Sequence, residues 1–398
     1  GAFAGSPITS LSLPASGAIS IGAFAFASSA ITELHIPANT VSIGQGAFAD
    51  CRMLKTVSLA DVSLGGYAFT NCISLEKVDL GGVSDITDSD FAGCSALKTV
   101  DGSSELSRIG KGAFRGCTSL SDFTFGNKLR YIGASAFAGS RINDAVIPPR
   151  TPLDSIGEWA FAYNPELRVV SLPDGTRAIG RGAFFDCPSL EAFALPKSCT
   201  ELADYTLKDA GSLDTMALYD GVASIGKYSL KGVSTVSYLT LPWTVEYIGD
   251  NALEGMTGLT AIDAASIPEV PRLGENVFAG ISQKDVRLDV DERIADLYKA
   301  APQWQEFTIN GTVSGAELPD VETQPQVRGR FDGTLLEIET SGADIADVEL
   351  YGTDGMLLAR ISAGTGFFSY DTSAYDAKIF IVRCTLSDSS VATLKLAR

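Results

Sequence analysis

The chain has 398 residues, of which 45% are hydrophobic and 20% charged, so it can bury a large core and is not disordered by composition. Its net charge of −18 would repel phosphate backbones and anionic membrane surfaces, which argues against nucleic acid and lipid as partners. No uninterrupted apolar run reaches the length of about 18 residues that a membrane-spanning helix needs.

A hexapeptide of the form Ile-Gly-x-x-Ala-Phe recurs along most of the chain at intervals of 21 to 25 residues. The chain opens on Ala2-Phe3, the tail of an earlier copy, so we expect the natural N-terminus to lie further upstream. A fixed period of this length predicts a solenoid, because one such unit cannot bury its apolar face alone. The twelve copies begin at Ile21, Ile43, Leu64, Ile86, Ile109, Ile132, Ile156, Ile179, Leu202, Ile225, Ile248 and Leu273.

Each repeat combines two short alternating runs with a segment of helical spacing. Val57 and Leu59 alternate with polar residues and predict a strand with one buried face, and a second run leads into the Ile-Gly pair. Ile43, Ala47, Phe48 and Cys51 then follow at a spacing that places them on one face of a helical turn. We therefore expect each coil to contain a strand, a turn, a short strand and a helical turn.

The phenylalanine of the hexapeptide should form a continuous inner spine through the stacked coils. Later coils replace it by leucine at three positions, Leu207, Leu230 and Leu253, which changes the packing volume only. The spine is predicted at Phe26, Phe48, Phe69, Phe91, Phe114, Phe137, Phe161, Phe184 and Phe278.

Most of the seven cysteines occupy one slot, three residues after this phenylalanine. Because other repeats place small apolar or small polar residues there, we expect a buried packing slot with free thiols. Parallel side chains of neighbouring coils fit the dihedral angle of a disulfide poorly, and a zinc site is disfavoured because the chain has no C-x-x-C pair and only one histidine, His35. The slot contains Cys51, Cys72, Cys94, Cys117 and Cys187.

The consensus Leu-x-x-Val-x-Leu-Pro followed by Ile-Gly-x-x-Ala-Phe-x-x-Cys resembles the BspA-type leucine-rich repeat over residues 1–285. The resemblance implies a right-handed leucine-rich repeat solenoid of the α/β type, with short strands and helical turns. It also implies a protein on the surface of an anaerobic bacterium, often of the Bacteroidetes. Several members of that family are associated with adhesion to host proteins or to other microbes.

Residues 286–313 are expected to cap the open end of the solenoid, whose apolar core would otherwise be exposed. The run from Val286 to Val290 predicts one more strand, and Ile294, Leu297 and Tyr298 are predicted to share one helical face. Trp304 and Phe307 would then cover the last coil. Residues 314–325 lack any periodic apolar pattern and are expected to form a linker.

Residues 326–398 lack the repeat and contain several short apolar runs separated by turns, one of them at Thr353-Asp354-Gly355, which favours a small β-sandwich. This region resembles the C-terminal sorting domain of type IX secretion cargo. The matching segments are 348–358, 379–383 and 394–396. The resemblance implies a role in export or anchoring, and a stalk or a cap without a sorting signal is the alternative.

No constellation of catalytic residues can be assembled from the sequence. His35 is the only histidine and is expected to be a solvated strand residue. Asp85, Asp88 and Asp90 come closest to a calcium loop, but the glycine and the distal glutamate of an EF-hand are absent. We therefore predict a non-catalytic protein without metal or other cofactor.

The outward residues of the first strand of each coil are the candidate binding face. Most are short polar residues, which is consistent with a long shallow groove for an extended peptide or glycan, or simply with a flat, soluble sheet. Trp159, Tyr163, Tyr131 and Tyr67 lie in or near the turns on the opposite side and offer a second patch. The candidate face contains Glu33, His35, Thr56, Ser58, Lys77, Asp79, Asp122, Thr124, Asp144 and Tyr238.

Together these features predict a secreted or cell-surface protein that presents an extended repeat surface to a protein or glycan partner. A structural scaffold without a dedicated ligand is one alternative, and a hydrolase using acidic groove residues is another. We expect a monomer that binds neither nucleic acid nor a small-molecule cofactor.

Overall fold

The computed structural model describes residues 1–312, 326–332, 335–341, 344–351, 357–373, 379–387 and 391–397. The chain divides into two compact units, Gly1–Ser314 and Gly315–Arg398. The linker expected at residues 314–325 and the turn expected at Thr353-Asp354-Gly355 lie outside the described residues. Within the described parts, no helix is long and apolar enough to cross a membrane.

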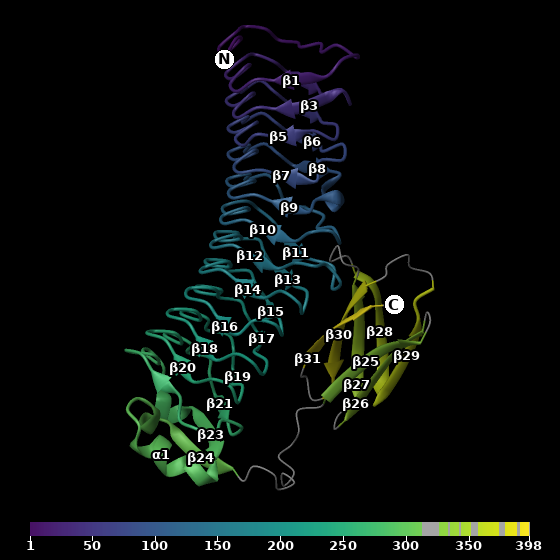
Figure 1. The fold of residues 1–398 in the computed structure, drawn as a ribbon. Coiled ribbons are helices and arrows are strands. Elements are labelled where there is room, and N and C mark those ends of the chain that lie inside the picture. Colours follow the sequence, from purple (N-terminus) through teal and green to yellow (C-terminus); the bar gives the residue numbers. More distant parts are fainter. Residues whose placement is uncertain are drawn as a thin grey trace. The chain divides into compact units, whose positions relative to one another are not determined.

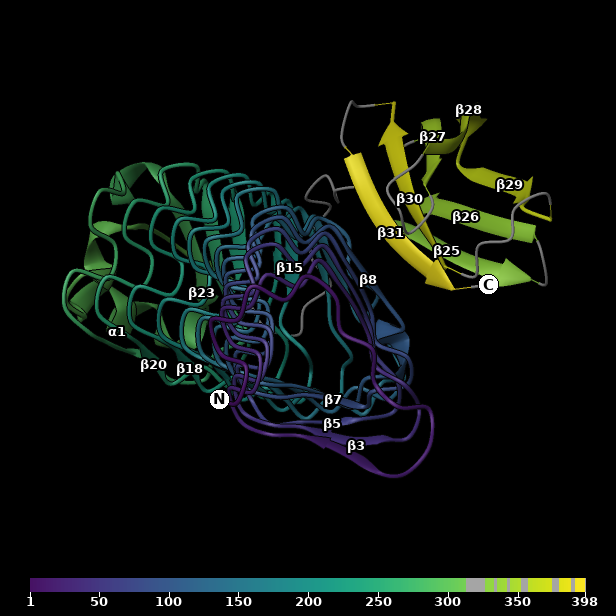
Figure 2. The ribbon, with the colours of Figure 1, turned by 90° about the horizontal axis from the view of Figure 1, so that it is seen from above.

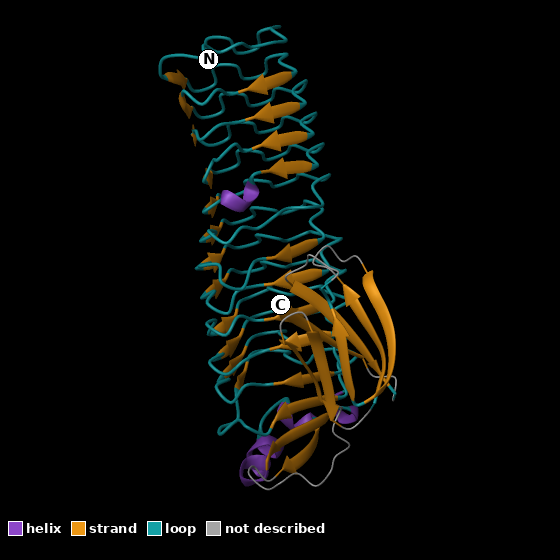
Figure 3. Cartoon of the chain, turned by 90° about the vertical axis from the view of Figure 1, so that its right-hand side faces the viewer, coloured by secondary structure: helices purple, strands orange, loops and turns teal. Residues whose placement is uncertain are grey.

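The first unit is a β-solenoid in which successive coils stack from the N-terminus to α1 (Figure 1). Most coils contribute a first strand and a second strand, and every strand pair in the stack is parallel. The two kinds of strand run along separate sides of the stack (Figures 2 and 3). The fold expected from the 21-to-25-residue repeat is therefore present, although its turns differ from the expectation.

The first strands form three parallel sheets along one side, in the orders β2-β4-β6-β8, β11-β13-β15-β17 and β19-β21-β23-β24. They are β2 (Glu33–His35), β4 (Thr56–Ser58), β6 (Lys77–Asp79), β8 (Thr99–Asp101), β11 (Asp144–Val146), β13 (Val169–Ser171), β15 (Ala192–Ala194), β17 (Thr215–Ala217), β19 (Tyr238–Thr240), β21 (Ala261–Ala264), β23 (Arg287–Asp291) and β24 (Thr308–Thr312).

The second strands form three further sheets, β1-β3-β5, β7-β9-β10-β12-β14 and β16-β18-β20-β22. They are β1 (Ile19–Ile21), β3 (Thr40–Ile43), β5 (Ser63–Leu64), β7 (Asp85–Ile86), β9 (Arg108–Ile109), β10 (Tyr131–Ile132), β12 (Ser155–Ile156), β14 (Ala178–Ile179), β16 (Glu201–Leu202), β18 (Ser224–Ile225), β20 (Tyr247–Ile248) and β22 (Arg272–Leu273).

The segments after the second strands are not helical, so the expected helical turns are wrong. In one such segment, Ala47 donates its N–H to Gly44 three residues earlier, whereas Gly46 and Phe48 donate to Gly66 and Ala68 of the next coil. An α-helix needs every N–H to bond four residues back within the segment. Left-handed residues such as Gly46 recur in these segments, so the backbone alternates between bonding within a coil and bonding between coils. The only α-helix in the described residues is α1 (Ala295–Ala300).

The predicted phenylalanine spine is confirmed. From Phe3 through Phe184, each ring stacks on that of the next coil, with centroids 5.2 to 5.5 Å apart. Leu207, Leu230 and Leu253 continue the column as buried residues. The spine thus forms the centre of one hydrophobic core that extends through the whole unit.

The residue after the isoleucine or leucine of the hexapeptide sets how closely the second strands approach. At nine glycines in this position, an added Cβ would lie only 2.4 to 2.8 Å from backbone atoms of the preceding coil, closer than a side chain permits. Eight of these glycines donate an N–H to the preceding coil at 2.7 to 2.8 Å. They are Gly44, Gly110, Gly133, Gly157, Gly180, Gly226, Gly249 and Gly274.

Two coils carry a different residue at this position, Thr87 and Ala203. The second-strand sheets are interrupted at these two coils, between β5 and β7 and between β14 and β16. We attribute both interruptions to the Cβ atom, because it cannot enter the space that the glycines leave for the neighbouring backbone.

The interruption at Thr87 is compensated by a buried aspartate, Asp90, which replaces the alanine of the hexapeptide. Its carboxylate accepts hydrogen bonds from the Thr87 N–H at 2.7 Å, the Thr87 hydroxyl at 2.8 Å and the Ala68 N–H at 3.1 Å. Burial raises the pKa of Asp90 above its usual value, although these donors act in the opposite direction. Ala203 has no comparable partner among the described hydrogen bonds of its N–H.

After β22 the chain forms η2 (Gln283–Asp285), and the cap then contains β23, η3 (Glu292–Ile294), α1, η4 (Trp304–Glu306) and β24. Trp304 is buried, donates its Nε1–H to the Pro271 carbonyl at 3.2 Å, and lies with its ring 5.0 Å from that of Phe278. Its ring therefore lies against the last coil of the stack. Leu297 was expected on the buried helical face, but it is exposed, because Ala295 and Tyr298 take the inward positions of this one-turn helix.

The second unit contains two antiparallel sheets, β25-β26-β29 and β28-β27-β30-β31. Buried residues of both sheets, among them Leu336, Phe368, Val348 and Val382, belong to one apolar cluster. In the first unit, a further 3-10 helix, η1 (Ser103–Glu105), lies between β8 and β9. The strands of the second unit are β25 (Gln326–Asp332), β26 (Leu335–Ser341), β27 (Ile345–Tyr351), β28 (Leu357–Thr365), β29 (Phe367–Asp371), β30 (Ile379–Leu386) and β31 (Val391–Ala397).

Candidate functional site

The first strands place the predicted binding-face residues in columns that follow the strand register. Their middle residues, such as Val57 and Val78, are buried, so the two flanking side chains point outward. The register aligns Glu33 with Thr56 and Lys77, and His35 with Ser58 and Asp79. We call the outward residues of the first strands, together with Asp122 and Thr124, the first-strand face.

The structure does not bring all ten predicted residues together. Glu33, His35, Thr56, Ser58, Lys77 and Asp79 share the sheet β2-β4-β6-β8. Asp122 and Thr124 are exposed in a coil that forms no first strand, and Asp144 begins the next sheet. Tyr238 begins the third, so the face consists of three sheet segments and is not one continuous sheet.

On the N-terminal segment of the face, a charged side chain forms an ion pair with a side chain of the next coil. The Lys77 Nζ lies 2.7 Å from an oxygen of Asp101, and this hydrogen bond raises the pKa of Lys77. Asp144, at the start of the middle segment, is half-buried, and burial raises the pKa of its carboxyl while nearby Arg168 opposes the shift. The face therefore carries mixed charges and not a field of one sign.

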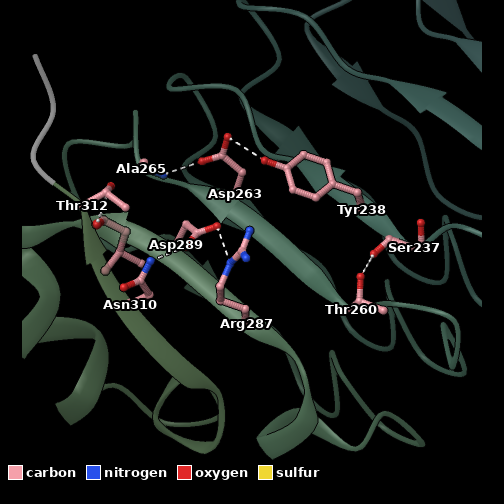
Figure 4. A network of polar contacts seen from close by, with 10 residues as sticks. Ser237, Tyr238, Thr260, Asp263, Ala265, Arg287, Asp289, Asn310 and Thr312 are labelled. Carbon is pink, nitrogen blue, oxygen red and sulfur yellow. Dashed lines mark hydrogen bonds and ion pairs between the residues drawn. The ribbon is translucent and has the colours of Figure 1, made fainter. Parts of the chain in front are cut away.

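The C-terminal segment carries the polar network shown in Figure 4. The Tyr238 hydroxyl donates to Asp263 at 3.2 Å, and the Ala265 N–H donates to the other oxygen of this carboxylate at 3.0 Å. Burial, followed by the negative charge of Asp263, raises the pKa of Tyr238. The tyrosine ring, 49% exposed, is therefore held in place by its neighbour in the next coil.

Asp289 continues this network one coil further (Figure 4). Its two oxygens accept hydrogen bonds from the Arg287 Nε at 2.9 Å and from the Asn310 Nδ2 at 2.8 Å. The bond from Asn310 links β24 to β23, whereas Arg287 and Asp289 both lie in β23. Side chains of this segment are thus ordered before any partner binds, which lowers the entropy lost on binding.

The second predicted patch lies on the turn side and is larger than the sequence indicated. Tyr67, Trp159 and Tyr163 adopt left-handed backbone conformations in the turn segments, whereas Tyr131 lies in β10 beneath the Arg108 guanidinium. Trp159 and Tyr163 are both in contact with the Phe185 ring, at centroid distances of 5.4 and 5.2 Å.

Sequence analysis missed several members of this turn-side group. Tyr205 and Tyr228 occupy the same repeat position as Trp159, three residues after the isoleucine or leucine, and their rings lie 5.1 Å apart. Alignment of the repeats by that position would have found the column. No sequence pattern distinguishes Arg181 from other surface arginines. The structure places its guanidinium over the Trp159 and Tyr205 rings.

A pocket of about 660 Å³ adjoins this group at the interruption between β14 and β16. Ionisable side chains that line it include Glu158, Arg181, Glu201, Asp204 and Lys227. No sequence motif marks this pocket, although Ala203, which replaces the repeat glycine, is among its lining residues.

The three aspartates considered for calcium do not converge. Asp90 is buried and bonds to Thr87 and Ala68, whereas Asp85 accepts from the Ser107 hydroxyl at 2.8 Å. Asp88 accepts from the Lys111 N–H at 3.0 Å. Within the described residues, no group of three or more His, Cys, Asp or Glu is placed to hold a metal ion.

Comparison with protein families gives a match over most of the chain. A family profile described as "BspA type Leucine rich repeat region (6 copies)" matches residues 1–64, 61–168 and 154–284. A search of curated proteins found no match.

Solved structures of repeat proteins are similar to the chain at low identity. A leucine-rich repeat protein of Bacteroides ovatus is 20% identical, with a TM-score of 0.37, over 71% of this chain and 92% of that one. A leucine-rich cell surface protein of Faecalibacterium prausnitzii is 17% identical, with a TM-score of 0.40, over 61% and 87%. The pneumococcal vaccine antigen PcpA is 15% identical, with a TM-score of 0.37, over 72% and 89%. Likeness of this degree carries no argument about function.

Proposed function

This chain belongs to the BspA-type leucine-rich repeat family, and we propose that it is a non-catalytic binding protein that works outside the cell or on its surface. The solenoid presents an extended surface to a protein or glycan partner. The second unit serves in export, anchoring or spacing. No cofactor takes part, and one chain is the binding unit.

The observation that carries this proposal is the first-strand face. Its outward side chains follow the register from coil to coil, as in Glu33, Thr56 and Lys77, and most of them are short. Short side chains leave the surface accessible to an extended partner, which gains affinity from many weak contacts. The ordered network around Asp263 and Asp289 supports this role, because its donors and acceptors are already in place (Figure 4).

Carboxylates of this face support binding better than hydrolysis. Asp101 is paired with Lys77, and Asp289 with Arg287. A glycosidase needs two carboxyl groups that face each other across a substrate, one of them with a raised pKa. Burial raises the pKa of Asp144, with Asp122 and Glu191 adding to the shift and Arg168 opposing it, so Asp144 keeps the hydrolase alternative open whereas the paired carboxylates do not.

The second unit is proposed to be a small β-sandwich of the kind that follows a solenoid in exported proteins. Support comes from its two antiparallel sheets and their shared apolar cluster. Of the segments that resemble sorting domains, 348–358 lies in β27 and β28 apart from residues 352–356, which are outside the described residues, while 379–383 lies in β30 and 394–396 in β31. Deletion of this unit in the native host, followed by fractionation, tests whether the solenoid still reaches the cell surface.

The binding proposal is tested with an array of proteins and glycans. The chains compared are the wild type, three single variants and the triple variant that combines them. Thr56→Trp, Lys77→Trp and Asp122→Arg, combined in one chain, should abolish binding of an array partner, since bulky groups then cover the face. Each single change should weaken binding only slightly, because no one residue anchors the partner. Chelator should leave the affinity unchanged.

The melting temperature of the triple variant serves as its folding control. If every array partner binds the folded triple variant as tightly as the wild type, the first-strand face is not a binding surface. A chain that binds nothing on the array would favour the structural scaffold instead.

A further inference from the structure

Three turn-side aromatic residues occupy a backbone conformation that is unfavourable for them. Trp159, Tyr205 and Tyr228 have φ angles of 57°, 60° and 56°. Other coils place glycine at the same repeat position, for example Gly112 and Gly182. All twelve coils adopt the left-handed conformation at this position, and some hold Ser89, Asn251 or Tyr67 there, so the conformation belongs to the repeat. A large aromatic residue in this region still costs free energy relative to glycine. The folding of the coil therefore does not explain why these residues are aromatic.

The three rings and one arginine form an ordered group, which we call the aromatic ridge. The Arg181 guanidinium lies 4.6 Å from the Tyr205 ring centroid and 5.6 Å from that of Trp159. A Cβ atom on Gly182 would come within 2.3 Å of the Trp159 ring, so the glycine makes the space in which the indole lies. Cation–π contacts hold Arg181 between the rings without neutralising its charge.

The ridge borders the pocket of about 660 Å³. Arg181 lines the pocket, and so do Glu158, Asp204 and Lys227, the chain neighbours of Trp159, Tyr205 and Tyr228. A pocket of this size lies within the range of small-ligand sites, about 300 to 1,000 Å³. The pocket therefore lies beside the ridge: Arg181 and the aromatic Tyr247 line it, whereas Trp159, Tyr205 and Tyr228 adjoin it through their chain neighbours.

The polar groups of the pocket are mixed in sign. Within the described part of the chain, no ion pair involves Arg181, Glu158 or Glu201. Asp204 accepts the Lys227 N–H through one oxygen, and the Lys227 Nζ bonds to Asp250. Strongly anionic and strongly cationic ligands would each meet like charges here, whereas a neutral ligand with many hydroxyl groups can both donate to the carboxylates and accept from the guanidinium.

We infer that the pocket and the aromatic ridge bind a neutral glycan, as a site separate from the first-strand face. Aromatic faces stack against the C–H faces of pyranose rings, and carboxylates with an arginine bond their hydroxyl groups. The ligand would lie along the second strands from the interruption between β14 and β16 to β20, the stretch whose residues line the pocket. This inference does not depend on the proposed role of the first-strand face.

Tryptophan fluorescence of the full chain tests the inference. Trp304 is buried and Trp243 is exposed, so Trp243→Phe leaves Trp159 as the tryptophan that reports on the surface. The probes are an array of neutral oligosaccharides, a matched set of uronic-acid and sulfated oligosaccharides, and an acidic peptide. At least one neutral oligosaccharide should produce a saturable change in the Trp159 emission.

Two variants then separate the site from the rest of the solenoid. Arg181→Ala removes the guanidinium that lies over the Trp159 and Tyr205 rings, and Ala203→Gly restores the repeat glycine so that the second strands can close over the pocket while its charged lining side chains stay unchanged. Each should weaken binding of the neutral oligosaccharide at least tenfold, measured by calorimetry. Tyr67→Ala is the matched control, because Tyr67 has the same repeat position and left-handed backbone but does not line the pocket.

The triple variant of the first-strand face should bind the neutral oligosaccharide as the wild type does, so failure of that proposal and failure of this one are distinguishable. Binding of no neutral oligosaccharide, or equal binding by folded Arg181→Ala and Ala203→Gly variants, would overturn the inference. So would a preference for the charged oligosaccharides or the acidic peptide.

Discussion

At the scale of single residues, the cysteine slot makes hydrogen bonds to a neighbouring coil as well as packing contacts. The Sγ of Cys72 donates to the Phe48 carbonyl of the preceding coil at 3.3 Å, and Cys94 does the same to Phe69 at 3.2 Å. Asn164 replaces a cysteine and donates its Nδ2–H to Phe137 at 2.9 Å. The slot therefore favours a small donor. The sequence predicted its burial, but not this bond, because the accepting carbonyl belongs to another coil.

All seven cysteines are free and buried, which gives a prediction for their reactivity. Burial raises the pKa of Cys187 to about 12, so its reactive thiolate is scarce at neutral pH. A thiol reagent should react with close to seven groups in denaturant without reductant, and only slowly with the native chain. A denatured count of three or fewer would show that disulfides form.

Phe114→Ala tests the spine. Its ring is fully buried between Phe91 and Phe137, so the change should destabilise the solenoid by about 3 to 5 kcal/mol through the cavity it leaves. Phe3→Ala is the control, because Phe3 lies at the exposed end of the same column. Denaturation measures the loss, and hydrogen exchange should rise first near residues 86–137. Uniform loss of protection along the stack would contradict this.

At the scale of one coil, the repeat predicted the strands and the spine, whereas the helical turn was wrong. The spacing of Ile43, Ala47, Phe48 and Cys51 fits a helix, but the left-handed residues sit at other positions of the segment. A side-chain pattern cannot reveal that alternate N–H groups bond to a neighbouring coil. The pocket was missed for a related reason, since the effect of Ala203 depends on the backbone of the preceding coil.

Thr87 and Asp90 should act as a compensating pair. Asp90→Ala leaves the Thr87 and Ala68 N–H groups without their acceptor and should cost about 1 to 3 kcal/mol. The double variant Thr87→Gly/Asp90→Ala restores the hexapeptide and should recover most of that loss. A double-mutant cycle measured by urea denaturation gives the coupling. Losses that simply add would show that the two residues are independent.

The same pair should make stability depend on pH. Because burial raises the folded-state pKa of Asp90, its contribution to stability is full below the unfolded value of about 3.9 and is lost as pH rises through the folded value. The double variant lacks this carboxyl, so its stability relative to the wild type should increase from pH 4 to pH 7. A difference that stays constant, or that falls, would mean that the donors around Asp90 outweigh its burial.

At the scale of the whole molecule, stability should come from contacts between neighbouring coils. The cap should stabilise the end of the stack by covering the last coil. Removal of residues 286–313 exposes the last coil that Trp304 covers, and should cause aggregation. Removal of residues 314–398 should leave a soluble, cooperatively folding solenoid. Light scattering and thermal denaturation of the two deletions compare them. Aggregation of the second deletion alone would place the boundary elsewhere.

The central claim is that the solenoid binds its partner through contacts spread over several coils. Hydrogen–deuterium exchange of the full chain, with and without a partner identified on the array, tests this most directly. We predict slower exchange in segments of at least three consecutive coils of the first unit, with the peptides of residues 326–397 unchanged. Protection confined to a single coil, or to residues 326–397 alone, would contradict the account.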